Sequence, residues 1–394
     1  MNKLLTISVL VCFISVGVVF AAPQDQPRVQ SGDITYLGYF DLPDGEWLYG
    51  QGIAISSDGT KLYINQAVDD EQIGIITIPS LSGTSSVDTA QTSISGSTGS
   101  TGNDSLGGFL HYNNRLIIQK KVAYDADSPD GLADNSHLAC NSALGSCTAM
   151  SPMESYGSIQ HVTGYMGLIP SEWQTLLGGP AFSGNSAMSI NSGCSNGPSF
   201  YVFDPDDVGV ESPIPHSKLM DFTVPNILGG AGNFTSCQES ISANDYYTCA
   251  DQNNAGIVFP SGTRSVLFFS THGYGTPTYK SGTDPCHPTA PGEEAYPYRL
   301  QITAFDATDL LAVKNGTKEA HEVEPYAWWE LPDPAQGAFD TCVFFTYSGL
   351  TYDPSTRRIY LRTDTYERIF VYEVAELSTT ETGSATASGS FAGQ

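Results

Sequence analysis

The sequence predicts an all-β fold, a β-propeller of at least five and up to seven blades, with loop insertions and disulfides. Two observations predict it: a strand–turn–strand phrase that recurs along the chain, and a composition rich in turn and aromatic residues. The chain has 40 Gly, 21 Tyr and 18 Phe, whereas charged residues make up only 15% of it. Glycine-rich turns and aromatic residues favour short strands over helices.

The clearest repeat is a hairpin phrase found near both ends of the chain. Residues 52–64 and 349–361 each combine a strand, a tight polar turn and a second strand, with apolar residues at alternate positions. Weaker copies start at Gly108 and Gly256. A β-sandwich does not repeat such a hairpin at both ends, and solenoid rungs are shorter and more regular. The repeat is therefore typical of propeller blades, and the similar first and last units indicate a closed ring.

Composition divides the chain into three segments. Residues 1–21 place Lys3 before an apolar run that ends in small residues, which predicts a signal peptide and a secreted or periplasmic protein. Residues 30–377 are expected to form one propeller domain, with a short helix over Glu172–Leu177 capped by Ser171. Residues 378–394 are mostly Ser, Thr, Gly and Ala and predict a disordered tail. No stretch of the mature chain is apolar enough to predict a membrane span.

The charge balance narrows the class of partner. The chain has 16 Lys and Arg against 42 Asp and Glu, for a net charge of −26. A basic footprint for nucleic acid is missing, so we expect no nucleic-acid partner. The expected partners are an extracellular glycan, a small molecule or a surface protein.

Seven cysteines remain once Cys12 leaves with the signal peptide, and in an exported chain they predict disulfides. The closest pairs are Cys140 with Cys147 and Cys237 with Cys249, each in a turn-rich loop. The odd count leaves one thiol free or paired between chains. None has C-x-x-C spacing, which argues against zinc and haem sites.

Several stretches resemble a group of exported bacterial proteins that are expected to be β-propellers. The similarity spans roughly residues 160–375 and implies export and a propeller fold, with no implication for activity. It rests on Gly164–Trp173 followed by Gly178–Ala181, on Gly262–Phe269 with His272 and Gly273, and on Ala295–Tyr298 leading to Val313–Gly316.

No standard catalytic motif for a metalloprotease, a serine hydrolase or a nucleotide-binding enzyme is present. The candidate catalytic residues are His272, Tyr298, His137 and Arg299, because His and Tyr near a loop at the channel mouth suit acid–base chemistry. The candidate ligand-binding residues are Tyr274, Tyr296, Tyr298 and His287. The alternative for each histidine is a structural role within its loop.

One acidic loop is a candidate calcium site. Its carboxylates occur at closely spaced positions before Gly131, and oxygen ligands of this kind suit a hard cation. The spacing departs from an EF-hand, and the alternative is a solvated acidic turn. The candidate metal ligands are Asp125, Asp127, Asp130 and Asp134.

Three classes of function are compatible with these residues. The leading hypothesis is a secreted propeller that binds a glycan, a surface partner or a small solute at the channel mouth, because Tyr and Trp faces suit sugar rings. The alternative is a secreted carbohydrate-active hydrolase or lyase. A structural surface component is the third. The loop from His272 to Tyr298 is the expected site in the first two classes.

Overall fold

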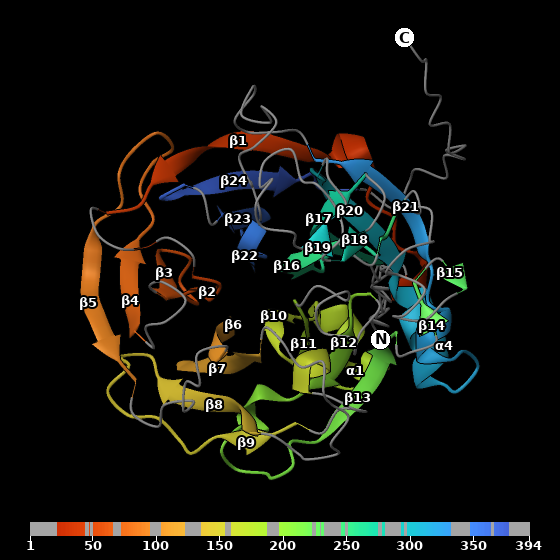
Figure 1. Cartoon of the computed structure of the whole chain (residues 1–394), viewed down its shortest axis with the longest axis horizontal. Helices are drawn as coiled ribbons and strands as arrows, with labels where there is room; N and C mark the ends of the chain where they lie inside the picture. Colours follow the sequence, from red (N-terminus) through yellow and green to blue (C-terminus); the bar gives the residue numbers. More distant parts are fainter. Residues whose placement is uncertain are drawn as a thin grey trace, which may run out of the picture.

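A computed structural model describes residues 22–43, 47, 50–65, 72–94, 104–122, 135–153, 159–186, 197–222, 226–228, 230–231, 246–248, 251–274, 278–279, 293–294, 298–331, 347–363 and 366–377. Over these ranges, five four-stranded antiparallel sheets surround a common axis (Figure 1). The predicted all-β propeller is thus confirmed, with five blades. The predicted signal peptide (1–21) and tail (378–394) lie outside the described residues.

The blades follow one another along the chain, from inner to outer strand. Blade 1 consists of β2 (Ile53–Ile55), β3 (Lys61–Asn65), β4 (Gln72–Thr77) and β5 (Val87–Ser93). Blade 2 consists of β6 (Asp104–Tyr112), β7 (Arg115–Val122), β8 (Asn135–Asn141) and β9 (Ser151–Pro152). Blade 3 consists of β10 (Gly164–Leu168), β11 (Ala181–Asn185), β12 (Phe200–Phe203) and β13 (His216–Met220).

Blade 4 consists of β16 (Gln252–Val258), β17 (Ser265–Gly273), β20 (Tyr298–Asp306) and β21 (Pro325–Glu330). Blade 5 consists of β22 (Tyr347–Asp353), β23 (Arg358–Thr363), β24 (Arg368–Val374) and the N-terminal β1 (Ile34–Asp41). The connections of the described part contain two short sheets, β14 (Asn226–Ile227) with β15 (Gly230–Ala231) and β18 (Thr278–Tyr279) with β19 (Glu293–Glu294). They also contain the helices α1 (Ser171–Leu177) and α4 (Ala307–Lys314).

The N-terminal strand closes the ring. β1 pairs with β24 from Ile34 opposite Val374 to Asp41 opposite Arg368. Blade 5 therefore takes three strands from the end of the chain and its outer strand from the beginning (Figure 1). The first and last repeats of the sequence are the inner hairpins of blades 1 and 5, whose inner strands β2 and β22 are in contact.

Apolar side chains fill the junctions between neighbouring blades. Because strand residues alternate between the two faces of a sheet, each blade offers one set to the blade before it and another to the blade after it. In β17, Val266 and Phe268 pack with residues of blade 3, whereas Leu267 and Phe269 pack with residues of blade 5. We call these two spaces the 3/4 junction and the 4/5 junction.

A ring of glycines keeps the inner strands close together. In or directly before each inner strand, a glycine lies beside a buried residue of the second strand: Gly52 with Asn65, Gly108 with Gln119, Gly164 with Asn185, Gly256 with Phe269, and Gly349 with Arg362. A Cβ on Gly349 would collide with the Gln51 carbonyl oxygen, and one on Gly108 would collide with the Tyr165 backbone. At Gly52, Gly108 and Gly349 a side chain is excluded because the next blade comes too close, whereas a Cβ on Gly164 would collide with Ser186 of its own blade.

Two of the second-strand residues in this ring link adjacent blades. Gln119 accepts hydrogen bonds from the backbone of Gly108 at 3.1 Å and of Gly164 in blade 3 at 2.9 Å. Arg362 of blade 5 donates to the Asn65 Oδ1 atom of blade 1 at 3.0 Å and to the Trp47 carbonyl. These buried groups replace water partners with backbone and side-chain partners from the next blade.

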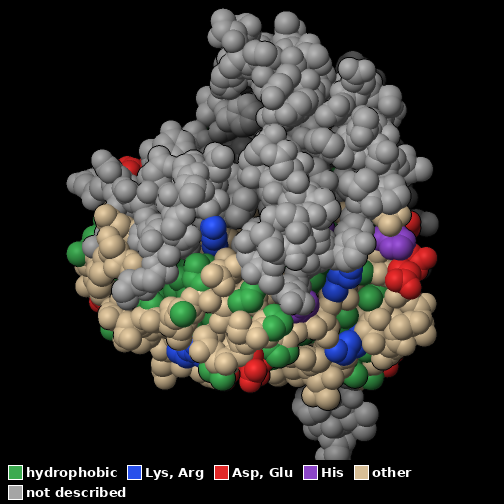
Figure 2. All heavy atoms as spheres, turned by 60° about the horizontal axis from the view of Figure 1, so that its bottom comes forward, with side chains coloured by type: hydrophobic (Ala, Val, Ile, Leu, Met, Phe, Trp, Pro, Cys, Tyr) green, Lys and Arg blue, Asp and Glu red, His purple; other side chains and the backbone are tan. Residues whose placement is uncertain are grey.

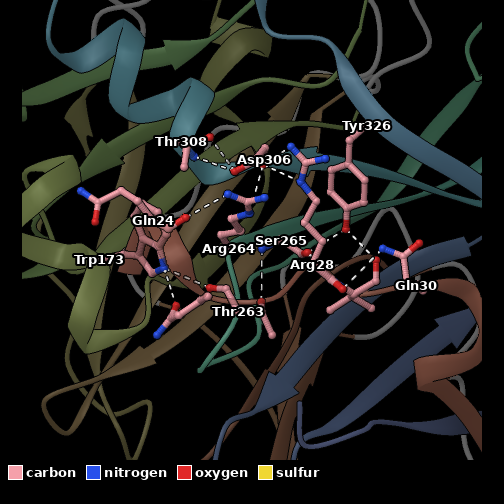
Figure 3. A network of polar contacts seen from close by, with 12 residues as sticks. Gln24, Arg28, Gln30, Trp173, Thr263, Arg264, Ser265, Asp306, Thr308 and Tyr326 are labelled. Atoms are coloured by element: carbon pink, nitrogen blue, oxygen red, sulfur yellow. Dashed lines mark hydrogen bonds and ion pairs between the residues drawn. The ribbon is translucent and has the colours of Figure 1, made fainter. Parts of the chain in front are cut away.

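The segment before β1, which we call the strap, crosses blade 4 where β17 begins and β20 ends (Figure 3). Arg28 contacts the buried Asp306 carboxylate at 2.6 Å, and Arg264 lies 3.4 Å from the same oxygen. Arg264 also donates to the Gln24 carbonyl at 2.9 Å. The Asp306 carboxylate therefore links the strap, the residue before β17 and the start of α4.

The predicted disulfide between Cys140 and Cys147 is confirmed. It closes the turn after β8, and Cys140 itself is buried. The second predicted pair, Cys237 with Cys249, lies outside the described residues.

Candidate functional site

The two ends of the ring differ in chemistry. At the turn end, each inner strand is joined to the second strand of its blade, by a short turn in four blades and by the connection that contains α1 in blade 3. At the opposite end, which we call the loop end, the second strand finishes and the inner strand of the next blade begins. Among the residues that the structure describes, six buried side-chain atoms at the loop end have no hydrogen-bond partner: Trp47 Nε1, Ser270 Oγ, Thr271 Oγ1, Gln301 Oε1, Ser348 Oγ and Thr363 Oγ1. Two buried atoms near the turn end of the described part, His111 Nδ1 and the Tyr352 hydroxyl, also lack partners. Because buried polar groups nearly always have partners, the larger set at the loop end favours that end as the place for water or a ligand.

The 3/4 junction changes from apolar to polar toward the loop end. On the face of β17 that carries Val266 and Phe268, the next residues are Ser270, His272 and Tyr274. The paired strand β20 places Gln301 opposite Ser270 and Arg299 opposite His272. Directly opposite residues of an antiparallel pair share a face, so these side chains form one polar row.

A buried His–Asp pair lies at the centre of this row. The His272 Nδ1 atom lies 2.9 Å from Asp251 Oδ2, and both side chains are almost fully buried. Asp251 precedes β16, and its other oxygen accepts hydrogen bonds from the Gly273 backbone at 3.0 Å and from the Thr248 hydroxyl at 2.8 Å. The carboxylate orients the imidazole through Nδ1, which directs Nε2 away from the pair.

Tyr274 extends the row toward the outer strand. Its ring contacts His272 edge-on, with centroids 4.8 Å apart, and its hydroxyl donates to Glu330 Oε1 at 3.2 Å. Burial raises the pKa of Tyr274, the Glu330 carboxylate raises it further, and Arg299 lowers it by a smaller amount. The phenol therefore keeps its proton at neutral pH and acts as a donor.

Two polar atoms of the row lack partners. The Gln301 amide nitrogen donates to the Tyr246 carbonyl at 3.0 Å, but within the described part of the chain its Oε1 atom has no partner. The Ser270 hydroxyl, opposite Gln301, is fully buried and likewise unpaired there. An acceptor and a hydroxyl are thus available beside His272.

A second buried His–Asp pair lies in blade 3. His161 Nδ1 lies 2.5 Å from Asp221 Oδ1, and Tyr201 donates to the other carboxylate oxygen at 3.1 Å. Burial by itself would raise the pKa of Asp221, but His161 and Lys218 bring it below its usual value. The Asp221 carboxylate contacts Tyr201 in β12, Lys218 in β13 and His161 before β10, so it links three segments of blade 3.

His137, a candidate from the sequence, lies inside the junction of blades 2 and 3. Its Nδ1 atom is 2.7 Å from the Ser136 hydroxyl and its Nε2 atom is 3.2 Å from the Ser183 hydroxyl. Burial lowers the pKa of His137 to about 3, and His216 contributes in the same direction. The imidazole is neutral and hydrogen-bonded at both nitrogens.

His272 and Tyr298, which the sequence analysis placed in one site, lie on opposite faces of the blade 4 sheet. Tyr298 pairs with Gly273 and alternates with Arg299 along β20, so it shares a face with Leu300. Leu300 packs in the 4/5 junction, whereas His272 faces the 3/4 junction. His272, Tyr274 and Arg299 are therefore brought together, and Tyr298 lies on the other side of the sheet.

The remaining candidates lie outside the described residues. These are the ligand-binding candidates Tyr296 and His287 and the calcium candidates Asp125, Asp127, Asp130 and Asp134. Over the described ranges, no group of three or more His, Cys, Asp or Glu side chains is arranged to hold a metal ion.

The helices of the described part are too short or too polar to cross a membrane.

Sequence reasoning missed Asp251, Glu330 and the His161–Asp221 pair. Asp251 carries no local motif, and Glu330 is the single acidic residue that follows Trp328 and Trp329. One signal was available for the glycine ring, since Gly164 stands at the start of an inner strand like the glycines that begin the other hairpin phrases.

A groove of about 780 Å³ lies outside the channel, between the chain after β13 and the chain after α4. Phe222, Leu228 and Tyr246 line it, together with the exposed residues His321 and Glu324. None of its described lining atoms is buried without a partner. The groove therefore lacks the unmet hydrogen-bonding demand of the loop end.

The face drawn in Figure 2 shows acidic, basic and apolar side chains interspersed, without a continuous basic patch among the described residues. This distribution agrees with the net charge of −26. Binding to a polyanion such as nucleic acid depends on clustered cations. The described part of this face lacks that feature.

No protein-family model and no curated protein matches the chain. Solved structures similar to it include glutaminyl cyclase from Myxococcus xanthus, at 9% identity and a TM-score of 0.38, covering 88% of this chain and 97% of that one. The β-propeller domain of Cps50 (Swd1) from Myceliophteria thermophila matches at 7% identity and a TM-score of 0.34, covering 83% and 84%. At these identities and TM-scores, the similarity carries no argument about the function of this chain.

Proposed function

We propose that the protein is an exported ligand-binding propeller that takes a glycan at the loop end of the 3/4 junction. The observation that carries the proposal is the polar row of blade 4, in which the Ser270 hydroxyl and the Gln301 carbonyl oxygen are buried beside His272 without partners among the described residues. Unpaired buried polar atoms cost about 1–3 kcal/mol each, so a site that retains them gains from a ligand that satisfies them.

The chemistry of the row suits a sugar. A glycan offers hydroxyl groups that both donate and accept, together with apolar ring faces. Gln301 Oε1 accepts, Arg299 donates, and the Ser270 hydroxyl does either. The half-buried Tyr274 ring provides a surface for a sugar ring, as aromatic side chains do in carbohydrate sites.

A glycan array with the purified wild-type protein is the first test. We expect binding that falls by about tenfold or more in the variants His272→Gln and Arg299→Gln, because each removes a group of the row. The matched control is His161→Gln, which disrupts the other buried His–Asp pair and should lose stability without losing binding. An array without signal, or equal losses in all three variants, would contradict the proposal. A signal from a surface protein or small solute alone would redirect it to those ligands.

The His272–Asp251 pair favours one alternative, a carbohydrate-active hydrolase or lyase. A carboxylate at Nδ1 holds the imidazole so that Nε2 is able to accept a proton, which is the arrangement of a general base. The raised pKa of Tyr274 removes the phenol as a base and leaves it as an acid.

Turnover separates the two functions. A binding protein leaves an array-positive oligosaccharide intact on prolonged incubation, whereas an enzyme shortens it. If cleavage occurs and His272→Gln abolishes it while His161→Gln does not, the enzyme alternative replaces the binding proposal.

A further inference from the structure

The two faces of β17 carry different polar groups at the loop end. Ser270 and His272 face the 3/4 junction, and Thr271 between them faces the 4/5 junction with Leu267 and Phe269. Across that junction, Thr363 continues the face of β23 that carries Leu361. Two threonines from neighbouring blades therefore extend the same apolar layer toward the loop end.

A third hydroxyl lies beside Thr363. Tyr347 pairs with Thr363 and Gly349 pairs with Arg362, so Ser348 is the extra residue of a β-bulge in the inner strand. Bulges leave a residue outside the ladder and often occur next to functional sites. Thr271, Thr363 and Ser348 are 1%, 1% and 6% exposed.

The three hydroxyls share an unmet demand. Within the described part of the chain, none of them has a hydrogen-bond partner. The indole N–H of Trp329, which packs in the same junction, is also buried and unpaired there. Valine or alanine would fill these positions without that cost, so the hydroxyls are better explained by something that binds them.

The described charges of the 4/5 junction indicate the chemical class of its ligand. The described charges at the loop ends of β24 and β1, Arg368 and Asp41, are paired with each other at 3.0 Å. The floor is apolar, with Phe269, Leu350 and Leu361 below the hydroxyls. The described side chains of this junction therefore suit a group that is uncharged, rich in hydroxyls and apolar on one side, such as a neutral sugar ring.

We propose that the loop end of the 4/5 junction is a second sugar subsite, one sheet away from the row that contains His272. This inference rests on the proposed glycan-binding function and extends it. A ligand that spans the end of β17 occupies both faces of the sheet, so the protein prefers a neutral oligosaccharide to a single sugar. Blade 4 lies between the two subsites.

The double variant Thr271→Val, Thr363→Val tests the subsite because valine has the shape of threonine without its hydroxyl. The probes are glucose, the disaccharides maltose and cellobiose, and glucuronic acid, measured by calorimetry. In the wild type we expect a disaccharide to bind more tightly than glucose, and glucuronic acid to gain nothing over glucose. In the double variant, disaccharide affinity falls by about tenfold while glucose affinity is unchanged.

Stability without sugar gives a second readout. The double variant should be at least as stable as the wild type, because it removes unpaired buried hydroxyls. The control Thr263→Val removes a buried hydroxyl that donates to the Pro260 carbonyl at 2.9 Å at the turn end, so it should lower the melting temperature and leave sugar binding intact.

The outcomes are distinct for the two proposals. Disaccharide binding unchanged in the double variant but lost in His272→Gln overturns the second subsite and leaves the proposed function standing. A double variant destabilised as much as Thr263→Val shows that the hydroxyls have a structural role and also overturns it. A wild type that binds none of the probes and no array glycan overturns both.

Discussion

At the scale of single residues, the missing side chains of the glycine ring set how closely the blades approach. A Cβ at Gly349 or at Gly108 would collide with backbone of the next blade, and backbone cannot move aside as a flexible side chain does. Any larger residue would push the inner strands apart and disturb the Gln119 and Arg362 links between blades. The same crowding explains why the second-strand partners are buried.

His137 provides a pH-dependent prediction at this scale. Its pKa of about 3 lies below the ordinary histidine value of 6.5, because burial disfavours the charged form. The unfolded chain therefore binds a proton between pH 6.5 and 3 that the folded chain does not, and stability falls as the pH drops through that window.

We expect His137→Gln to reduce this loss by about 2 kcal/mol between pH 7 and pH 5, whatever its effect at pH 7. Urea unfolding of both proteins at the two pH values measures the difference. Parallel losses in the wild type and the variant would show that His137 is charged in the folded protein.

At the scale of elements, capping decides where the helices begin and end. The helix predicted over Glu172–Leu177 is confirmed as α1, but Pro170 rather than Ser171 is its N-cap, and Gly178 ends it with a left-handed φ of 97°. The helix α4 was not predicted from the sequence. Its N-cap is Asp306, whose side chain accepts from the Thr308 backbone at 2.9 Å.

Asp306 also holds the strap, which allows a matched pair of substitutions in one element. Asp306→Asn keeps an oxygen for the cap but loses the charge that faces Arg28 and Arg264, and we expect it to lower the free energy of unfolding by about 1–3 kcal/mol. Asp309→Asn in the same helix removes an exposed pair with Lys318 and should change it by less than about 1 kcal/mol.

Urea denaturation of the two variants tests this difference. If both variants unfold at the same urea concentration, the network in Figure 3 contributes no more than an exposed ion pair.

At the scale of the whole molecule, the ring is held by the pairing of β1 with β24. Phe40 of β1 is fully buried and packs with Ile53 and Ile64 of blade 1 as well as Ile369 of blade 5. The N-terminal strand therefore belongs to the core of two blades. Opening it exposes a junction as well as the edge of a sheet.

Phe40→Ala should lower the free energy of unfolding by about 3–5 kcal/mol, and the loss should be felt around the ring. Hydrogen exchange measures this by blade: we expect protection to fall in β7 of blade 2 as much as in β24, because closure couples all five sheets. A loss confined to blade 5 and blade 1 would mean that the blades open independently.

Local patterning was sufficient for much of the architecture. Alternation of apolar residues and the hairpin phrases at 52–64 and 349–361 predicted strands, blades and a closed ring, since the two-residue period of a strand is visible in neighbouring positions. The Cys140–Cys147 disulfide followed from short spacing in a turn-rich loop. In each case the interacting groups are close in sequence.

The polar groups at the loop end were decided only by tertiary structure. The sequence by itself placed His272 directly after a strand, at the start of a loop rich in aromatic residues, whereas in the structure His272 lies within β17. The register of β17 with β20 decides which face His272 takes and that Tyr298 lies on the other face. The packing of blade 4 between its neighbours brings Asp251 to His272. A one-residue change in register exchanges the two faces of a strand, and local sequence leaves that register open until the blades pack.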